Sequence, residues 1–356
     1  MKLKVLELFG GIGACSKALE KLEIDYEIAD YVEIDKYAVK SFNAMHDTNF
    51  EPQDICEWDK DIEVDLIMHG SPCQSISLAG LQHGADKGSG TRSSLMWETV
   101  RIVEKLKPKY VIWENVKNLL SKKHRHNFDA YLDTIEKLGY TNYYQVLNAK
   151  DYGIPQNRER VFTISILGNE KYEFPPKQEL KLKLKDMLED EVDEKYYLSE
   201  KMVKYISAVG TANFRNPDCK INLDIARPIT TDPNKRAGTT NYLSDELPSN
   251  YDLRVIKDGG LYENRQAGSI YNKNGLCPTI TTEASQNWNI LLNDCPRIRK
   301  LTPKECWKLM GFDANDFEKA KSSGNSDTQL YKQAGNSIVV NVLEAILKNL
   351  LLGGKE

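Results

Sequence analysis

One cysteine stands in a segment that suits nucleophilic chemistry. The chain has 356 residues and seven cysteines, of which no two have the CxxC spacing of a zinc or redox site. Six are expected to be small buried apolar residues, which is the common role of cysteine. Cys73 differs, because it follows Ser71-Pro72 and precedes a polar, glycine-rich stretch, Gln74–Arg92. A thiolate in such a turn is a nucleophile, and the stretch after it could close over a substrate.

A carboxylate and two arginines could assist this nucleophile. Glu114 follows the apolar run Lys109–Trp113, and an acidic side chain at the end of a strand can donate a proton. In an extended chain Arg158 and Arg160 share one face with Gln156. Two guanidinium groups on one face predict a carbonyl or phosphate ligand. The alternatives are a solvent-exposed glutamate and a ladder of surface salt bridges.

A glycine-rich turn near the N-terminus could hold a cofactor. The first expected strand ends in Phe9-Gly10-Gly11-Ile12-Gly13, where glycines allow a ligand to approach the backbone. The dinucleotide pattern GxGxxG fits imperfectly, because its third position falls on Ser16. Glu33 lies twenty residues after Gly13, at the end of the second strand, where a carboxylate can accept both hydroxyls of a ribose. Together these residues predict a nucleoside-containing cofactor, with tight packing as the alternative.

The elements that must position these residues alternate between strands and helices. Strands are expected at Lys4–Phe9, Glu27–Glu33, Asp65–His69, Lys109–Trp113 and Val161–Leu167. Helices are expected at Ala14–Leu22, Tyr37–His46, Leu95–Leu106 and Phe128–Leu138. This alternation predicts an α/β fold with a mostly parallel, doubly wound sheet. Each of Phe9, Glu33, Cys73 and Glu114 then falls at the carboxyl end of a strand, where such sheets bind ligands.

The chain changes character after Phe174-Pro175-Pro176. Residues 200–295 are rich in Asn, Thr, Gly, Pro and Tyr, which predicts an irregular, β-containing module. Helical periodicity returns at Thr302–Met310 and Asn341–Leu351. We therefore expect a first domain over 1–175, a smaller second domain with its linker over 176–298, and a return over 299–356 that completes the first.

Charge and hydropathy bear on which partners and which cellular location are expected. The net charge is −4, yet residues 201–304 hold fifteen Lys and Arg against ten Asp and Glu, a weak indication of a phosphate-facing surface. No apolar run approaches about 20 residues, which argues against a membrane span. The N-terminus has no signal-peptide pattern, so a cytoplasmic protein is expected.

Taken in their order along the chain, these motifs resemble those of the cytosine-5 DNA methyltransferases of bacteria and phages. The resemblance covers nearly the full chain. The part of the resemblance that concerns the cofactor covers Phe9–Gly13, Glu33-Ile34-Asp35, Asp54-Ile55 and Tyr331–Val339. It implies the fold of an S-adenosylmethionine-dependent methyltransferase with that cofactor bound. The contacts that it implies come from Phe9, Gly11, Gly13, Glu33, Ile34, Asp54, Ile55, Pro72, Asn336 and Ser337.

The catalytic part of the resemblance covers Ser71-Pro72-Cys73-Gln74, Glu114-Asn115-Val116 and Gln156–Arg160, and Arg299–Glu305 is similar to the motif that anchors the recognition domain. It implies that Cys73 adds to C6 of a cytosine and Glu114 protonates N3. Arg158 and Arg160 would bind the O2 carbonyl. The base must leave the duplex for this chemistry, and we assign its C5 proton to no side chain.

The resemblance also implies partners. Double-stranded DNA is the expected substrate, residues 176–298 the expected target recognition domain, and a monomer without metal the expected state. The expected DNA contacts are Gln74, Ser77, Arg92, Arg227, Arg236 and Thr281. It is compatible with a cognate restriction endonuclease that forms no stable complex with this chain. The expected location is the cytoplasm of a bacterial cell, where the gene could also come from a phage.

Three alternatives stay open. A tRNA cytosine-5 methyltransferase has the same fold, although those relatives typically show a doubled proline before the cysteine, where this chain has Ser71-Pro72. A catalytically silent DNA-binding relative would not need Cys73, Glu114 and Arg160 together. A nicotinamide or flavin oxidoreductase is a rival at the level of the fold alone.

Overall fold

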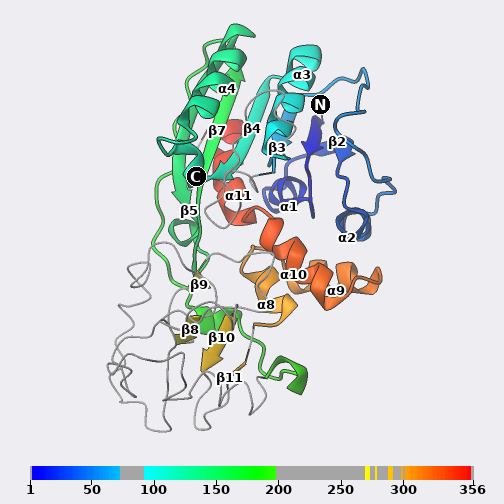
Figure 1. The fold of residues 1–356 in the computed structure, drawn as a ribbon, viewed down its shortest axis with the longest axis vertical. Coiled ribbons are helices and arrows are strands. Elements are labelled where there is room, and N and C mark those ends of the chain that lie inside the picture. Colours follow the sequence, from blue (N-terminus) through cyan, green and yellow to red (C-terminus); the bar gives the residue numbers. More distant parts are fainter. Residues whose placement is uncertain are drawn as a thin grey trace, which may run out of the picture.

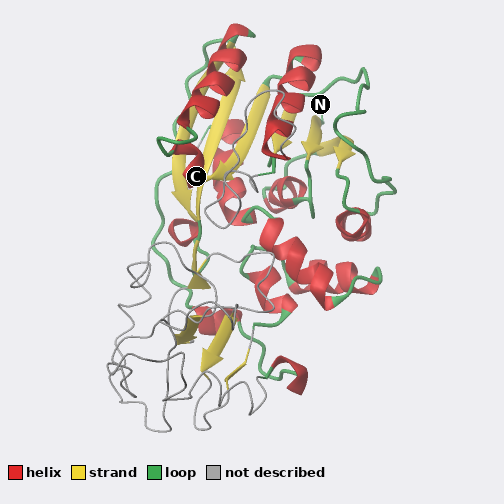
Figure 2. Cartoon of the chain, in the orientation of Figure 1, coloured by secondary structure: helices red, strands yellow, loops and turns green. Residues whose placement is uncertain are grey.

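The structure is a computed structural model that describes residues 2–72, 92–197 and 301–353, with the backbone of four short strands between residues 269 and 299. Several residues expected at the site lie outside this description: Cys73, Gln74, Ser77, Arg227, Arg236 and Thr281. Only the backbone of Arg92 is described. Figures 1 and 2 draw the described elements as coloured ribbons.

A six-stranded sheet forms the centre of the larger part of the molecule, with strand order β2-β1-β3-β4-β7-β5 (Figure 1). Its strands are β1 (Leu3–Leu8), β2 (Tyr26–Val32), β3 (Leu66–His69), β4 (Tyr110–Val116), β5 (Tyr140–Asn148) and β7 (Glu159–Leu167). The pairs from β2 to β4 are parallel, whereas β7 runs antiparallel to both β4 and β5. The amino end of β7 therefore lies at the edge where the parallel strands end. We call this the carboxyl edge of the sheet.

Helices cover both faces of the sheet. The described helices are α1 (Ala14–Lys21), α2 (Lys36–His46), α3 (Met96–Leu106), α4 (Arg125–Lys137), α8 (Pro303–Lys308), α9 (Ala314–Ser322), α10 (Asp327–Asn336) and α11 (Val340–Leu352). Of these, α8, α9 and α10 lie beyond the carboxyl edge of the sheet (Figure 1). Successive strand residues enter different cores, as the pleat requires. Val5 packs in one core with α1 and α11, and Leu6 packs in the other with α3 and α4.

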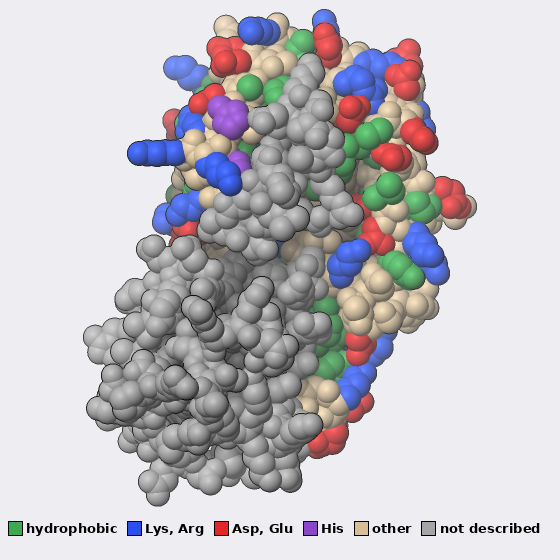
Figure 3. Space-filling view, viewed as in Figure 1, with side chains coloured by type: hydrophobic (Ala, Val, Ile, Leu, Met, Phe, Trp, Pro, Cys, Tyr) green, Lys and Arg blue, Asp and Glu red, His purple; other side chains and the backbone are tan. Residues whose placement is uncertain are grey.

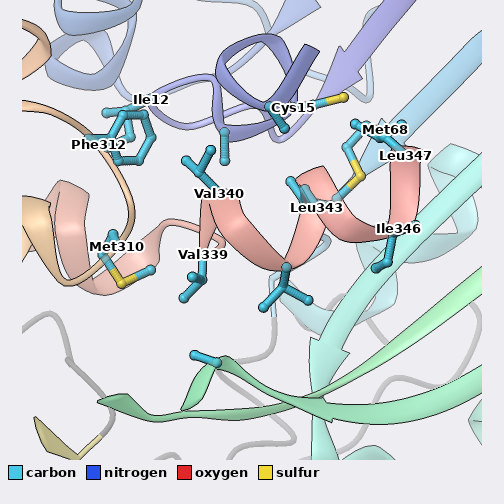
Figure 4. Close-up of a cluster of buried hydrophobic side chains, with 14 of the residues drawn as sticks. Ile12, Cys15, Met68, Met310, Phe312, Val339, Val340, Leu343, Ile346 and Leu347 are labelled. Carbon is cyan, nitrogen blue, oxygen red and sulfur yellow. The ribbon is translucent and has the colours of Figure 1, made fainter. Parts of the chain in front are cut away.

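The last helix, α11, lies in the core beside the first. Figure 4 shows its Val340 facing Ile12 and its Leu343 beside Met68. By length and composition the run Asp327–Leu352 is apolar enough to cross a membrane, within the described residues. That run is interrupted after Asn336, and Leu343 is fully buried inside the protein. Its apolar character is therefore explained by packing in the core.

Shorter elements complete the description. The 3-10 helices are η1 (Arg92–Leu95), η2 (Lys117–Leu120), η3 (Ala149–Tyr152), η4 (Leu184–Met187) and η5 (Glu194–Tyr196). The remaining strands are β6 (Gln156–Asn157), β8 (Ser269–Asn272), β9 (Cys277–Pro278), β10 (Trp288–Leu291) and β11 (Ile298–Arg299). β8, β10 and β11 form a separate sheet, and β6 pairs with β9.

The expected strands and helices of the first domain are all present, within a few residues of their predicted limits. The sheet is mostly parallel, but the direction of β7 was not foreseen. β5, α9 and α10 were not predicted either. Cys56 is exposed, which corrects the expectation that every cysteine other than Cys73 is buried; Cys15 and Cys306 are buried as expected.

Candidate active site

A small pocket that opens to solvent lies at the carboxyl edge of the sheet. Its walls come from the turn after β1, the end of β3, the end of β4 and the segment between α10 and α11. Among the predicted site residues it is lined by Phe9, Gly11, Glu114, Asn336 and Ser337. Residues expected to bind a cofactor and a residue expected to do acid catalysis therefore share one cavity.

The turn after β1 depends on its glycines. Phe9, Gly11 and Gly13 all have positive φ angles, of 53°, 56° and 75°. A Cβ atom at Gly13 would lie 2.7 Å from the ring of Phe42, so no other residue fits there without displacing α2. The turn thus brings backbone N–H groups close to the cavity at the start of α1.

Glu33 joins this turn to the end of β2. One carboxylate oxygen accepts from the backbone N–H of Gly11 at 3.1 Å, and the other accepts from that of Asp35 at 2.8 Å. Burial raises the pKa of Glu33, while these backbone donors act in the opposite direction. Ile34, the next residue, is 67% exposed, which is unusual for an isoleucine. A fixed carboxylate beside an apolar surface suits a ribose and its attached base.

The loop that carries Asp54 and Ile55 is held from behind. Asp54 is exposed and its side chain accepts from the backbone N–H of Cys56 at 2.9 Å, whereas Ile55 is buried. Arg101 of α3 donates to the carbonyl groups of Ile55 and Trp58, at 3.0 Å and 2.9 Å. The loop therefore has a defined position.

Asp30 of β2 secures the same loop from the sheet. Its buried carboxylate accepts from the indole N–H of Trp58 at 2.7 Å and from the amide of Gln53 at 3.0 Å, and it pairs with Lys60 at 2.7 Å. Burial acts to raise the pKa of Asp30, but these donors outweigh it and lower that pKa. Asp30 is thus a charged anchor.

Glu114 and Arg160 meet at the carboxyl edge. Nε of Arg160 lies 2.9 Å from Oε1 of Glu114, and both side chains are largely buried. They come together because β7 is antiparallel to β4, which sets Arg160 opposite Val116. A planar donor group beside a carboxyl group can bind two neighbouring polar atoms of one ligand.

Arg158 does not share this position with Arg160. Its guanidinium group donates to the carbonyl groups of Ser337, at 2.8 Å, and Gly335, at 3.3 Å. Gln156 donates instead to the carbonyl group of Leu309 at 2.7 Å. The chain is not one continuous strand here, since β6 ends at Asn157 and β7 begins at Glu159. This corrects the expectation that both arginines face one ligand: Arg158 holds the segment between α10 and α11.

The turn before Cys73 is fixed by two residues of β4. The indole N–H of Trp113 donates to the hydroxyl of Ser71 at 3.0 Å, and the amide of Asn115 donates to the carbonyl group of Ser71 at 3.4 Å. Strand alternation places both on the face opposite Glu114. The role of Trp113 was missed from the sequence, although its position one residue before Glu114 was the available signal.

Behind this turn lies a buried histidine. Nε2 of His69 is 3.0 Å from the hydroxyl of Tyr131, and its ring stacks on Trp113 with 5.6 Å between centroids. Burial lowers the pKa of His69 to about 3, so it is neutral in the folded protein at ordinary pH. The end of β3 therefore rests on a packed, uncharged aromatic cluster.

Comparison with known proteins places these features in a family. The family model of C-5 cytosine-specific DNA methylases matches residues 3–352. The chain is similar to the type II methyltransferase M2.ScrFI of Lactococcus lactis subsp. cremoris, with 35% identity over 98% of this chain and 99% of that protein. It is also similar to the orphan methyltransferase M.SPBetaI of Bacillus phage SPbeta, with 33% identity over 98% of each chain.

Solved structures agree at the level of the fold. The Entamoeba histolytica methyltransferase EhMeth has a TM-score of 0.70 at 18% identity, covering 100% of both chains. The S. pombe Dnmt2 methyltransferase has a TM-score of 0.66 at 18% identity, again over 100% of both chains. The predicted fold class is confirmed, and the chain belongs to the family of C-5 cytosine-specific DNA methylases, enzymes that methylate carbon 5 of cytosine in DNA.

Proposed function

We propose that the chain transfers the methyl group of S-adenosylmethionine to C5 of a cytosine flipped out of a specific sequence in double-stranded DNA, through a covalent bond between Cys73 and C6. The observation that carries this proposal is the pair formed by Glu114 and Arg160, which lies beside the glycine turn of the cofactor cavity. Acid, carbonyl-binding group and cofactor turn thus meet at one edge of the sheet.

The residues around the cavity fit S-adenosylmethionine. The turn at Gly11 and Gly13 admits a ligand close to the backbone, Glu33 can accept the ribose hydroxyls, and the exposed Ile34 can cover one face of the adenine. Asp54 is exposed and follows Gln53, whose backbone N–H donates to the carbonyl group of Glu33 at 2.9 Å, so it can accept from the adenine amino group. When bound, the cofactor supplies an activated methyl group on a positively charged sulfur. The residues of the chain would orient it.

Cytosine C5 is unreactive until a nucleophile adds to the ring. The thiolate of Cys73 would form a bond to C6, and Glu114 would give a proton to N3, which turns C5 into an enamine-like carbon. Arg160 would bind O2, the carbonyl oxygen on C2, which lies beside N3 on the same edge of the base. The paired side chains, 2.9 Å apart, suit these two adjacent atoms. After methylation the C5 proton would leave to water, N3 would return its proton to Glu114, and the Cys73–C6 bond would break to release the thiolate.

The first test is methyl transfer by Cys73→Ser. We expect loss of methylation of mixed-sequence duplex DNA, with S-adenosylmethionine affinity, measured by calorimetry, within a few-fold of the original. Cys56→Ser, which changes an exposed cysteine, is the matched control and should keep full activity. Turnover in Cys73→Ser would remove the central claim.

A second test concerns the covalent step and the substrate. Duplex DNA with 5-fluorocytosine in the recognised site cannot lose a C5 proton, so a stable adduct should form only with S-adenosylmethionine present. The same assays with tRNA distinguish the alternative substrate. Methylation of tRNA but not of duplex DNA would overturn the proposed function.

The state in the cell is also part of the proposal. We infer that the chain acts as a monomer on DNA in the bacterial cytoplasm and forms no stable complex with a restriction endonuclease. The relatives include both type II and orphan methyltransferases. Mass photometry with and without DNA tests the monomer, and a stable dimer without DNA would contradict it.

A further inference from the structure

Three aromatic rings pack beneath the turn that leads to Cys73. They belong to His69 at the end of β3, Trp113 of β4 and Tyr131 of α4, and each side chain is at most 1% exposed. The rings of His69 and Trp113 are stacked with 6° between their planes, and the ring centroids of Trp113 and Tyr131 lie 4.1 Å apart. We call these three residues the ring cluster. It joins the two central strands of the sheet to α4.

The amphipathic pattern of α4 brings Tyr131 into the ring cluster. The buried residues of this helix are Asn127, Phe128, Tyr131 and Ile135, which recur at helical spacing along one side. Figure 3 shows charged side chains on the surface over the region of α4, where its other side faces solvent. The whole inner side of the helix therefore holds Tyr131 in place.

One hydrogen bond directs the ring of His69 within the described part of the chain. Nε2 lies 3.0 Å from the hydroxyl of Tyr131, while Nδ1 has no partner among the described residues. Burial lowers the pKa of His69 to about 3, so the ring is neutral and forms no ion pair. Stacking alone lets a ring turn in its plane, whereas a hydrogen bond has a preferred direction. The orientation of His69 therefore depends on Tyr131.

Stability does not account for the pair of His69 and Tyr131. Placing an imidazole and a phenol hydroxyl in an apolar core costs free energy, which a single hydrogen bond offsets only in part. Two apolar rings of similar shape would fill the space about as well. A directional bond in a dry core does, however, restrict the arrangements that its neighbours can take. The pair thus contributes orientation more than stability.

Trp113 transmits this orientation to the turn before Cys73. Its indole N–H donates to the hydroxyl of Ser71 at 3.0 Å, which requires the indole to lie at a defined angle. His69 and Tyr131 both contact this indole, so a change in their arrangement would tilt it. Ser71 stands two residues before Cys73, so a tilt would displace the start of the segment that carries the cysteine.

We propose that Tyr131 is a positioning residue for the methylation reaction. Its hydroxyl fixes the ring of His69, and through Trp113 and Ser71 it aligns the segment that carries Cys73. This rests on the proposed function, because it takes Cys73 as the nucleophile. Tyr131 is fully buried, so it acts on alignment without contacting DNA or cofactor. Its effect belongs in kcat and not in KM.

The variant Tyr131→Phe tests this role, because it keeps the ring and removes only the hydroxyl. We expect kcat to fall about fivefold, since a small misalignment slows a reaction that needs close approach. KM for S-adenosylmethionine and for DNA should stay unchanged. The rate of adduct formation with 5-fluorocytosine DNA should fall by the same factor, because it includes the attack of Cys73. His69→Phe removes the same hydrogen bond from its other partner and should give a similar loss that does not add to the first.

The matched control is Tyr140→Phe. Tyr140 is buried in the same core, and its hydroxyl donates to the carbonyl group of Pro108 at 2.7 Å, just before the other end of β4. Tyr131→Phe and Tyr140→Phe should each lose a few degrees of melting temperature. Only Tyr131→Phe should lose kcat, measured well below both melting temperatures. An equal loss of kcat in the control would show that the rate follows the stability of the core, and would overturn the proposal.

The route through Ser71 is tested in the Ser71→Ala background. The contact with Trp113 is already absent there, so Tyr131→Phe should change kcat little while its loss of melting temperature persists. A purely structural role would keep the full loss of kcat. A normal rate in Tyr131→Phe, or an undiminished loss in the Ser71→Ala background, overturns the inference. Methylation of DNA by Cys73→Ser would overturn the proposed function instead, so the two failures are distinguishable.

Discussion

At the scale of single residues, the hydrogen bond from Trp113 to Ser71 ties the strand that carries Glu114 to the turn that leads into Cys73. Ser71 is only 4% exposed, so water cannot easily replace the indole as partner of its hydroxyl. Under the proposed function, Trp113 is a positioning residue that acts through the turn before Cys73. A small shift of such a turn is enough to slow a reaction that needs close alignment.

We predict that Trp113→Phe lowers kcat about tenfold and leaves KM for S-adenosylmethionine nearly unchanged. Phenylalanine keeps the aromatic packing but cannot donate to Ser71. Steady-state kinetics measures both constants. In a double-mutant cycle Ser71→Ala should add little to the loss, because both changes remove one interaction. Additive losses would show that the two residues act separately.

Glu114, the proposed acid, can be tested by removing its proton. We predict that Glu114→Gln loses most of the rate, on the order of a hundredfold or more, with little change in DNA affinity. Glutamine keeps the shape of the side chain but has no proton of suitable acidity to give. Single-turnover methylation and a binding assay measure the two effects. A near-normal rate would mean that N3 receives its proton from another group.

Substitutions of Arg160 and Arg158 should change different kinetic constants. Arg160→Lys should lower kcat, because lysine loses the planar donor group beside Glu114. Arg158→Lys should instead lower the melting temperature and raise KM for S-adenosylmethionine, since Arg158 holds Ser337 at the cavity wall. Kinetics with both variants tests this, and equal losses of kcat at normal KM would contradict it.

At the scale of elements, the loop from Gln53 to Lys60 shows how a strand and a helix fix a segment that has no regular structure of its own. Asp30 holds it from β2 and Arg101 from α3. We predict that Asp30→Asn raises KM for S-adenosylmethionine severalfold, while kcat at saturation stays unchanged. Glu57→Gln, an exposed change on the same loop, is the control. A loss of kcat without a change in KM would contradict this role.

Sequence periodicity predicted the elements whose burial pattern is strong. β3 and β4 are apolar runs buried on both faces, and the first four helices each show one apolar face. β5 was missed because its sequence, Tyr140–Asn148, is largely polar and lies at the edge of the sheet. A strand's direction leaves no trace in its periodicity, so the reversal of β7 could not be predicted.

The same limit applies to the candidate site. The spacing of Phe9, Glu33 and Glu114 at strand ends predicted that they belong together, since parallel strands end at one edge. The partner of Arg158 could not be predicted, because Ser337 lies 179 residues away and is brought close only by the folded chain. Asn336 and Ser337 were identified through the family resemblance, which carries information that residue patterns do not.

At the scale of the whole molecule, His69 links stability to pH. Its pKa in the folded protein is about 3, below the usual value of 6.5 for the unfolded chain. The unfolded state therefore binds a proton first as the pH falls, which favours unfolding. The stability from a neutral His69 is complete above pH 6.5 and is lost progressively towards pH 3.

We predict that the free energy of unfolding falls by up to about 1.4 kcal/mol per pH unit below pH 6 from this residue alone. Urea titrations between pH 7 and pH 5 measure it. His69→Phe keeps a ring against Trp113 but cannot titrate, so its curve should be flatter over this range. Parallel curves for the two proteins would show that other groups cause the loss.

The contact between α1 and α11 has a consequence for synthesis. On the ribosome the strands and early helices emerge first, but the apolar side of α1 finds its cover only when α11 appears, more than 300 residues later. The wall made by Asn336 and Ser337 arrives at the same late moment. A nascent chain halted before α10 and α11 would therefore lack one wall of the pocket and the cover of α1, so we expect it to be inactive until its last helix is translated.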